Sequence, residues 1–242
     1  MLQWLRSLAF ITLMYLAMVV MGILGLPYAM ISRDKTRQLI RIYANFVRWS
    51  AHHVAGLRSE IRGPVPQDEV VVASKHQSFF DILMLLSVLP RPKFIMKAEL
   101  KYAPILGFYA LRIGCIPVDR GKRGQAIQKM RADVSAGRAE PGQLVIFPQG
   151  TRVAPGVDAP YKVGVGVIYE ALEQDCVPAA TNVGVFWPRR GIYRRPGTAV
   201  LEFLPRIPAG KRVPELMAEL APVIETRSEE LRREALNLPQ QG

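Results

Sequence analysis

Three polar clusters combine residue types that can act on a bound substrate, and each follows a short apolar run. They are SKHQSFFD at 74–81, PVDRGKR at 117–123 and FPQGTR at 147–152. A histidine near a carboxylate is suited to proton transfer, whereas arginine and a glycine-containing turn are suited to binding an anion. The sequence therefore predicts a site that handles a proton and a negatively charged group.

His76 and Asp81 are five positions apart in the first cluster. A turn at this spacing can bring the carboxylate to one ring nitrogen, where it fixes the tautomer and stabilises the imidazolium that forms on proton uptake. A helix-capping aspartate beside an unrelated loop histidine has the same spacing, so this pair alone leaves both interpretations open. Ser78 is not expected to be a nucleophile, since the chain has no G-x-S-x-G elbow.

The other two clusters offer groups that bind anions. Arg120 follows a predicted strand, where it is either a surface side chain paired with Asp119 or a ligand. Gly150 permits an unusual backbone turn, and Thr151 and Arg152 supply hydrogen-bond donors. Exposed N–H groups beside a guanidinium would suit a phosphate group.

The elements expected to position these clusters alternate between strands and helices. The predicted strands are Glu69–Ser74, Lys93–Met96, Gly114–Val118, Gly142–Phe147, Pro178–Val185 and Ala199–Leu204. The predicted helices are Asp81–Leu89, Tyr102–Leu111, Gly124–Ala136, Tyr161–Gln174 and Val213–Leu236. This alternation predicts an α/β fold with a mixed, largely parallel sheet flanked by helices. If the strands are neighbours, one cleft beyond their ends receives His76, Asp81, Arg120, Gln149 and Arg152.

The N-terminal part is predicted to be a membrane-anchoring helical region over residues 1–62, with a second domain over residues 63–242. No charged residue occurs from Ser7 to Ser32, a stretch long enough to cross a hydrocarbon core of about 30 Å. A cleaved signal peptide is the alternative, but its apolar run would be shorter and would end in a small-residue cleavage site. Two glycines and a proline near the end suggest a kink, so a half-inserted segment stays open beside a spanning helix.

Residues 33–57 are predicted to form a helix with one apolar and one basic side. The basic side carries Arg37, Arg41, Arg48 and His52. Such a helix suits an anionic lipid surface, although the same pattern fits a helix packed on its own domain with solvated arginines. The basic residues follow the apolar segment, so the positive-inside rule places the main domain in the cytoplasm.

The formal net charge of +12 favours an anionic partner, such as an anionic membrane surface, a phosphorylated substrate or nucleic acid. Nucleic acid is not expected, because no zinc-finger, RRM or helix-turn-helix signature accompanies the charge. Cys115 and Cys176 have no second ligand at metal-binding spacing. They are predicted to be reduced core thiols, and no metal site is predicted.

Four segments occur in the order and spacing of the four sequence blocks of one family: KHQSFFD, FIMKAELKYAPILGFYALRIGCIPVDRG, VIFPQGTR and VPAATNVGVFW. Over about residues 70 to 205 the chain therefore resembles the glycerolipid acyltransferases, and most closely the bacterial 1-acyl-sn-glycerol-3-phosphate acyltransferases of the PlsC type. The resemblance implies that family's fold, an N-terminal membrane-associated helical hairpin, and a place on the cytoplasmic face of the bacterial inner membrane.

The resemblance also implies a reaction. His76, held by Asp81, would deprotonate the sn-2 hydroxyl of lysophosphatidate, which would attack the thioester of acyl-ACP or acyl-CoA and give phosphatidate. No metal, cofactor or acyl-enzyme is implied. Val177 and Pro178 begin the block that is implied to line the acyl side. The residues implied to bind the substrates are Lys97, Arg120, Gln149, Gly150, Thr151 and Arg152.

Gln149 departs from the family pattern, which usually has glutamate in FPEGTR. Glutamine keeps the size and one acceptor, loses the charge and gains a donor. We therefore expect Gln149 to hydrogen-bond acceptor hydroxyls and Gln149→Glu to retain activity.

Three other functions use the same residues. An acyltransferase acting on another lysolipid, such as a lyso-ornithine lipid, would leave Arg120 and Arg152 without a phosphate. A catalytically altered membrane lipid-binding protein would account for Gln149, but the intact His76 and Asp81 argue against it. A hydrolase would need water to outcompete the acceptor hydroxyl. The sequence does not choose between ACP and CoA, although a basic surface suits acidic ACP.

Overall fold

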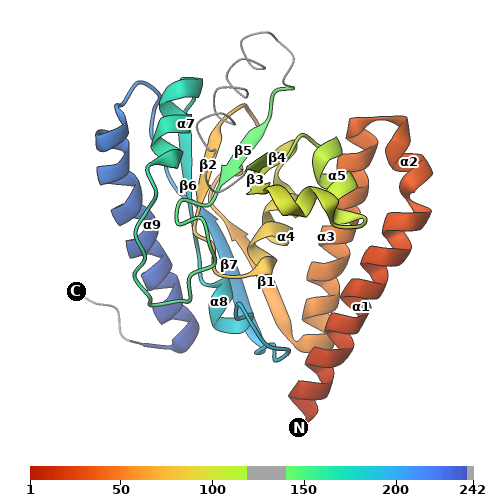
Figure 1. Ribbon diagram of the computed structural model, residues 1–242. Helices are drawn as coiled ribbons and strands as arrows, with labels where there is room; N and C mark the ends of the chain where they lie inside the picture. Colours follow the sequence, from red (N-terminus) through yellow and green to blue (C-terminus); the bar gives the residue numbers. More distant parts are fainter. Residues whose placement is uncertain (119–139, 239–242) are drawn as a thin grey trace.

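The computed structural model describes residues 1–118 and 140–238 (Figure 1). Arg120 and the predicted helix at Gly124–Ala136 therefore lie outside the described residues. The strands are β1 (Leu57–Arg62), β2 (Val71–Ser74), β3 (Pro92–Lys97), β4 (Ile116–Val118), β5 (Gln143–Ile146), β6 (Cys176–Thr181) and β7 (Gly197–Phe203). The helices are α1 (Leu2–Leu24), α2 (Leu26–Ile31), α3 (Arg33–Ala55), α4 (Phe79–Val88), η1 (Ala98–Tyr102), α5 (Leu106–Arg112), α7 (Gly164–Leu172), α8 (Val183–Phe186) and α9 (Val213–Leu236).

The described strands form one sheet in the order β1-β7-β6-β2-β5-β3-β4. All neighbouring pairs are parallel except β6 and β7, which confirms a mixed, largely parallel sheet. Strands β2 and β5 are direct neighbours, with Val71 opposite Leu144. The loops that carry the first and third polar clusters therefore follow the carboxyl ends of two neighbouring parallel strands, so they leave the sheet side by side.

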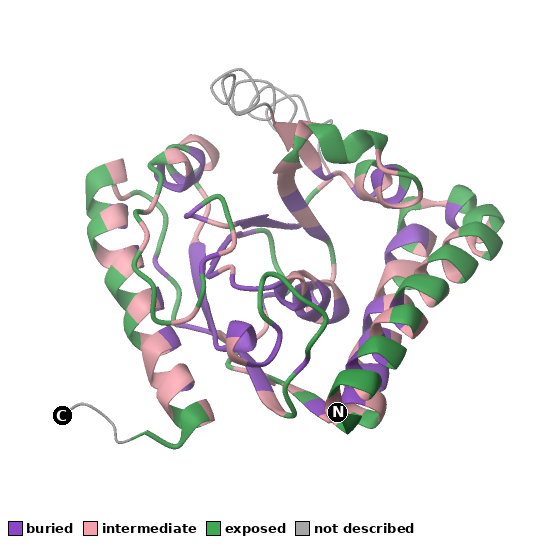
Figure 2. Cartoon of the chain, turned by 60° about the horizontal axis from the view of Figure 1, so that its bottom comes forward, coloured by how far each residue is buried: buried purple, intermediate pink, exposed green. Residues whose placement is uncertain are grey.

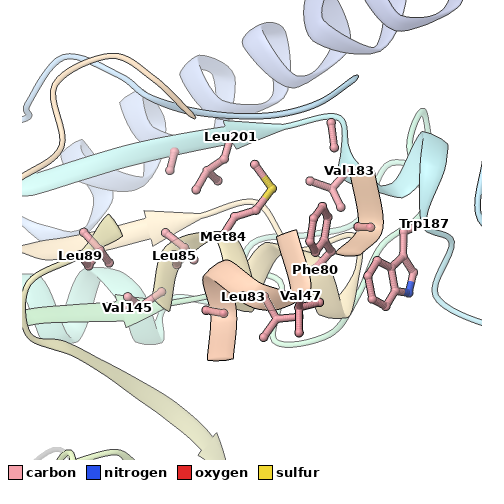
Figure 3. Close-up of a cluster of buried hydrophobic side chains, with 14 of the residues drawn as sticks. Val47, Phe80, Leu83, Met84, Leu85, Leu89, Val145, Val183, Trp187 and Leu201 are labelled. Atoms are coloured by element: carbon pink, nitrogen blue, oxygen red, sulfur yellow. The ribbon is translucent and has the colours of Figure 1, made fainter. Parts of the chain in front are cut away.

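Helices cover both faces of the sheet, with α3 and α4 on one side and α7 and α9 on the other (Figure 1). Every residue of β2 is buried, because Val72 packs into the α3 and α4 core while Val71 and Ala73 pack into the α7 and α9 core. Burial on both faces is the reason that the strand is a continuous apolar run. Figure 3 shows the first of these cores, in which α4 places Phe80 and Met84 among side chains from the sheet and from α3.

Strand β1 was not predicted. Its sequence LRSEIR pairs with β7 as an edge strand, and its charged residues are exposed or partly exposed, so it lacks the apolar run of an internal strand. It falls within the region 1–62 although it completes the sheet. The predicted strand Pro178–Val185 is also wrong in its second half, because the chain leaves β6 at Thr181 and forms α8.

Helices α1, α2 and α3 form an N-terminal hairpin, in which α3 runs back along α1 (Figure 1). Among the described residues, α1 alone is long and apolar enough to cross a membrane. An 18-residue stretch of α1 has a mean hydropathy of 2.3, and only 17% of that stretch is buried inside the protein. It buries Phe10 and Met14 against the protein and exposes large apolar side chains along most of its length (Figure 2). This exposed apolar surface indicates association with a membrane.

The basic side of α3 faces the protein, which favours the second interpretation of its amphipathic pattern, a helix packed on its own domain. Arg37 is buried and pairs with Asp34 and Glu140. The guanidinium of Arg48 donates to the hydroxyls of two serines, Ser59 at 2.8 Å and Ser87 at 2.9 Å. These arginines form their ion pairs and hydrogen bonds within the chain, because a buried guanidinium needs acceptors from the protein itself.

The two cysteines are buried and form no disulfide bond, as predicted. Burial raises the pKa of the Cys115 thiol to about 11 and that of Cys176 to about 12. Both are therefore neutral thiols near pH 7.

Candidate active site

The turn between β2 and α4 brings His76 against Asp81. Ser78 is the N-cap of α4 and Asp81 its third residue, and the two form a capping box. Oδ2 of Asp81 accepts from the backbone N–H of Gln77 at 2.6 Å and of Ser78 at 2.7 Å, and it lies 3.1 Å from Nδ1 of His76. The capping and orienting roles were alternatives in the sequence, but in the structure one carboxylate oxygen performs both.

This arrangement fixes the tautomer of His76. Oδ2 of Asp81 already accepts from two backbone amides, so in this contact Nδ1 of His76 carries the hydrogen and donates it. Nε2 is then left with a free lone pair, as a general base requires. The ring also stacks on Phe147, with centroids 3.9 Å apart and planes 17° apart. The orientation of the base is thus held from its edge and from its face.

The FPQGTR turn lies directly beside the histidine. The backbone N–H of Val153 donates to the carbonyl of His76 at 2.8 Å, which joins the two loops. Gly150 has the left-handed φ of +68°, and a Cβ there would lie 2.9 Å from Nζ of Lys162. The predicted unusual turn at Gly150 is therefore confirmed, because its left-handed backbone conformation is one that glycine adopts without a steric penalty.

One cavity of ≈ 590 Å³ receives these groups. His76, Lys97, Gly150, Thr151 and Arg152 all line it. Its apolar lining comes from helices α1, α3, α4, α5 and α7 and from strands β3, β4 and β5. It includes Met18, Met21, Ile40, Leu83, Phe94, Leu106, Ala110 and Ile116. A cavity that is mostly apolar, with a few convergent polar groups, is typical of a site for a small molecule.

The cationic lining is larger than the sequence indicated. Lys162 and Arg189 join Lys97 and Arg152, and no aspartate or glutamate lines the cavity among the described residues. Arg152 and Arg189 each donate to the other's backbone carbonyl at 3.3 Å, which joins the two residues. In the part of the chain that the structure describes, no carboxylate pairs with any of the four cations. Such a cluster favours an anionic ligand.

A family model described as acyltransferase matches residues 57–182. The chain belongs to this acyltransferase family. It is 28% identical over 222 residues to the 1-acyl-sn-glycerol-3-phosphate acyltransferase of Pseudomonas aeruginosa, which covers 90% of this chain and 86% of that protein. It is 29% identical over 174 residues to the human 1-acyl-sn-glycerol-3-phosphate acyltransferase alpha, covering 70% of this chain and 62% of the human protein.

A solved structure has the same fold as this acyltransferase. It is the crystal structure of the 1-acyl-sn-glycerophosphate (LPA) acyltransferase PlsC from Thermotoga maritima. The TM-score is 0.78 at 18% identity, over 95% of this chain and 97% of the other. The resemblance of fold thus includes the N-terminal hairpin as well as the sheet.

Gln149 does not lie where the sequence placed it. Its side chain is buried outside the cavity, and its Nε2 lies 3.3 Å from Oε1 of Glu225 on α9. The predicted contact with acceptor hydroxyls therefore has no basis in this geometry. Val177 and Pro178 are likewise buried within β6 and do not line the cavity of the acyltransferase.

Lys162, Arg189 and Glu225 are the groups that sequence reasoning missed. Arg189 lies in WPRRG, where a basic pair beside proline and glycine was the available signal. Lys162 follows the FPQGTR turn by ten residues, and its amide donates to the carbonyl of Pro148 at 3.0 Å. That contact returns the chain to the turn, so a residue distant in sequence enters the site.

Proposed function

We propose that this acyltransferase transfers a fatty acyl group from acyl-ACP or acyl-CoA to the sn-2 hydroxyl of 1-acyl-glycerol-3-phosphate, giving phosphatidate. The observation that carries the proposal is the composition of one cavity, in which an oriented histidine, four cations and an extensive apolar lining occur together. The names of the relatives support the same acceptor.

The proposed reaction needs one base. Nε2 of His76 takes the proton from the acceptor hydroxyl as its oxygen attacks the thioester carbon. The C–O bond forms, the C–S bond breaks, and the imidazolium returns the proton to the departing thiolate. Asp81 stabilises the imidazolium through Nδ1, so the carboxylate acts while the charge exists. The acyl thioester is the only co-substrate that this scheme requires.

The cationic lining is proposed to hold the acceptor phosphate. Arg152→Ala is expected to raise KM for lysophosphatidate by about tenfold or more, since it removes a charge-assisted hydrogen bond, while kcat changes less. Steady-state kinetics of the purified full chain in detergent measures both. Arg190→Ala is the matched control, because Arg190 is exposed next to Arg189 but does not line the cavity. An unchanged KM in Arg152→Ala would count against a phosphate role.

A panel of acceptors tests the proposed function itself. Purified enzyme receives oleoyl-CoA or oleoyl-ACP together with lysophosphatidate, lysophosphatidylcholine, a monoacylglycerol or a lyso-ornithine lipid. We expect the fastest transfer to lysophosphatidate, because the acceptors without a phosphomonoester lack the group that the four cations bind. The highest rate on a lyso-ornithine lipid would keep the chemistry but replace the proposed acceptor.

We also propose that the hairpin sits in an anionic bacterial inner membrane, with the catalytic domain on its cytoplasmic face. Exposed apolar residues continue from α1 through α2 to α5, which is held beside α2 by a 2.8 Å bond from Arg112 to the carbonyl of Ala29. The positions of the basic residues in the sequence support the cytoplasmic side. The strongly basic chain favours acidic ACP as the donor.

Charged substitutions on α1 test the membrane contact. Leu16 and Val20 are exposed apolar residues on α1. The double variant Leu16→Lys/Val20→Lys is expected to lose most binding to phosphatidylglycerol-containing vesicles, because a charge in the hydrocarbon region costs about 2.5–3.5 kcal/mol per residue. Vesicle flotation measures the bound fraction. Val223→Lys on α9, which also replaces an exposed valine, is expected to bind normally. Equal vesicle binding by the wild type, the double variant and Val223→Lys would contradict the placement.

A further inference from the structure

A polar cluster behind the cavity joins both loops of the active site to α9. Oε1 of Glu225 accepts from Nζ of Lys75 at 2.7 Å, from the hydroxyl of Tyr161 at 2.8 Å and from Nε2 of Gln149 at 3.3 Å. Oε2 of Glu225 accepts from Nζ of Lys75 at 2.6 Å. Lys75 immediately precedes His76, and Gln149 immediately precedes the glycine of the FPQGTR turn. One carboxylate is therefore bound to both loops.

The burial of this cluster makes its charge balance important. The side chain of Lys75 is only 3% exposed, whereas that of Glu225 is 35% exposed. A buried ammonium without a carboxylate is strongly destabilising, so Lys75 requires one negative partner. Glu225 supplies that charge, and the pair is neutral overall.

The neutral side chain of Gln149 fits this balance. Its amide donates to the same carboxylate oxygen that accepts from Lys75. A glutamate at this position would place a second negative charge against Glu225, with a single ammonium to serve both. Burial and the Glu225 carboxylate raise the pKa of the Tyr161 hydroxyl, so Tyr161 stays a donor and adds no charge. A glutamine thus adds no charge to the cluster, while its Oε1 is buried with no hydrogen-bond partner among the described residues.

We propose that Glu225 is a positioning residue for acyl transfer, and that it supplies from α9 the carboxylate that the family pattern usually has at position 149. The proposal rests on the proposed function, because positioning is measured through acyl transfer. The Lys75 and Gln149 contacts fix where the base and the anion-binding turn lie relative to each other. This reverses the expectation that Gln149→Glu retains activity.

A charge exchange between the two positions tests the proposal. Gln149→Glu and Glu225→Gln are each expected to lower kcat about tenfold or more and to lower Tm by about 10 °C, the size of shift that an uncompensated buried charge gives in a chain of this length. The double variant Gln149→Glu/Glu225→Gln restores one carboxylate beside Lys75. It is expected to regain most of both losses. Rescue of kcat by the exchange is a result that two independent structural defects would not give.

A matched control comes from the same helix. Glu219 is 41% exposed and pairs with Lys211, which is 36% exposed. Glu219→Gln makes the same chemical change at similar exposure, but it leaves no buried ammonium unpaired. Its kcat is expected to stay within about twofold and its Tm within a few degrees of the wild-type values.

The proposal would be overturned if the double variant lost as much kcat and Tm as the two single variants together. Normal kcat in both single variants would overturn it too. If Gln149→Glu yields no folded protein, Gln149→Ala is the milder probe, because it removes the Gln149 donor to Glu225 without adding a charge. An unchanged kcat in Gln149→Ala would then overturn the positioning role. If the wild type itself transfers no acyl group, the proposed function fails. The Tm values of the wild type, the two single variants and the double variant then still show whether the charges at positions 149 and 225 compensate each other.

Discussion

Replacing His76 by alanine is expected to lower kcat for acyl transfer by about 10²–10⁴-fold, the usual contribution of a general base. No other histidine lines the cavity in the described part of the chain, so no second imidazole can take the proton there. The capping bonds of Asp81 come from backbone amides and survive the change, so Tm should stay close to the wild-type value. Initial rates with lysophosphatidate and an acyl thioester measure the effect.

His53 provides the control for this change. It is an exposed histidine on α3, outside the cavity, and its ring lies on Trp49. His53→Ala is expected to keep kcat within about twofold, in line with the small effects of most surface substitutions. A near-normal rate for His76→Ala would show that His76 is not the base, whatever the control does.

Asp81→Asn is expected to lower kcat by about 10²-fold or more while the protein stays folded. An asparagine oxygen can still accept from the amides of Gln77 and Ser78, so much of the capping survives. The negative charge opposite Nδ1 of His76 is lost, and the imidazolium that forms during transfer is no longer stabilised. Steady-state kinetics together with thermal unfolding separates the two effects.

Asp81→Ala completes that experiment, because it removes the charge and the cap together. It is expected to lower kcat at least as far as Asp81→Asn and to lower stability further, by about 0.5–2 kcal/mol, the usual value of a lost N-cap interaction. Normal turnover in Asp81→Asn with lowered stability in Asp81→Ala would reduce Asp81 to a capping residue.

Features encoded by neighbouring residues could be predicted from the sequence. The His76 and Asp81 pair and the turn at Gly150 depend on spacing and on backbone conformation within a few residues, and the structure has both. The mixed sheet followed from alternating apolar runs, since internal strands are buried on both faces. Strand β1 was missed because an edge strand has no such run.

Features that depend on the direction of a side chain could not be predicted. Arg189 reaches Arg152 across 37 positions of sequence, and Glu225 reaches Gln149 across 76. Residue type predicted a polar role for Gln149 but not whether it faces the cavity or α9. The arginines of α3 show the same limit, because an amphipathic pattern does not tell whether lipid or protein covers the basic side.

The stoichiometry of the reaction catalysed by the purified wild-type protein tests the proposed acyl transfer most directly. Labelled oleoyl thioester and lysophosphatidate are incubated with the enzyme in detergent, and released thiol, free oleate and phosphatidate are counted together. We expect one phosphatidate for each thiol released, little free oleate, and loss of both products in His76→Ala. Thiol release that yields oleate instead of phosphatidate, or no thiol release on any acceptor, would contradict the proposed acyl transfer.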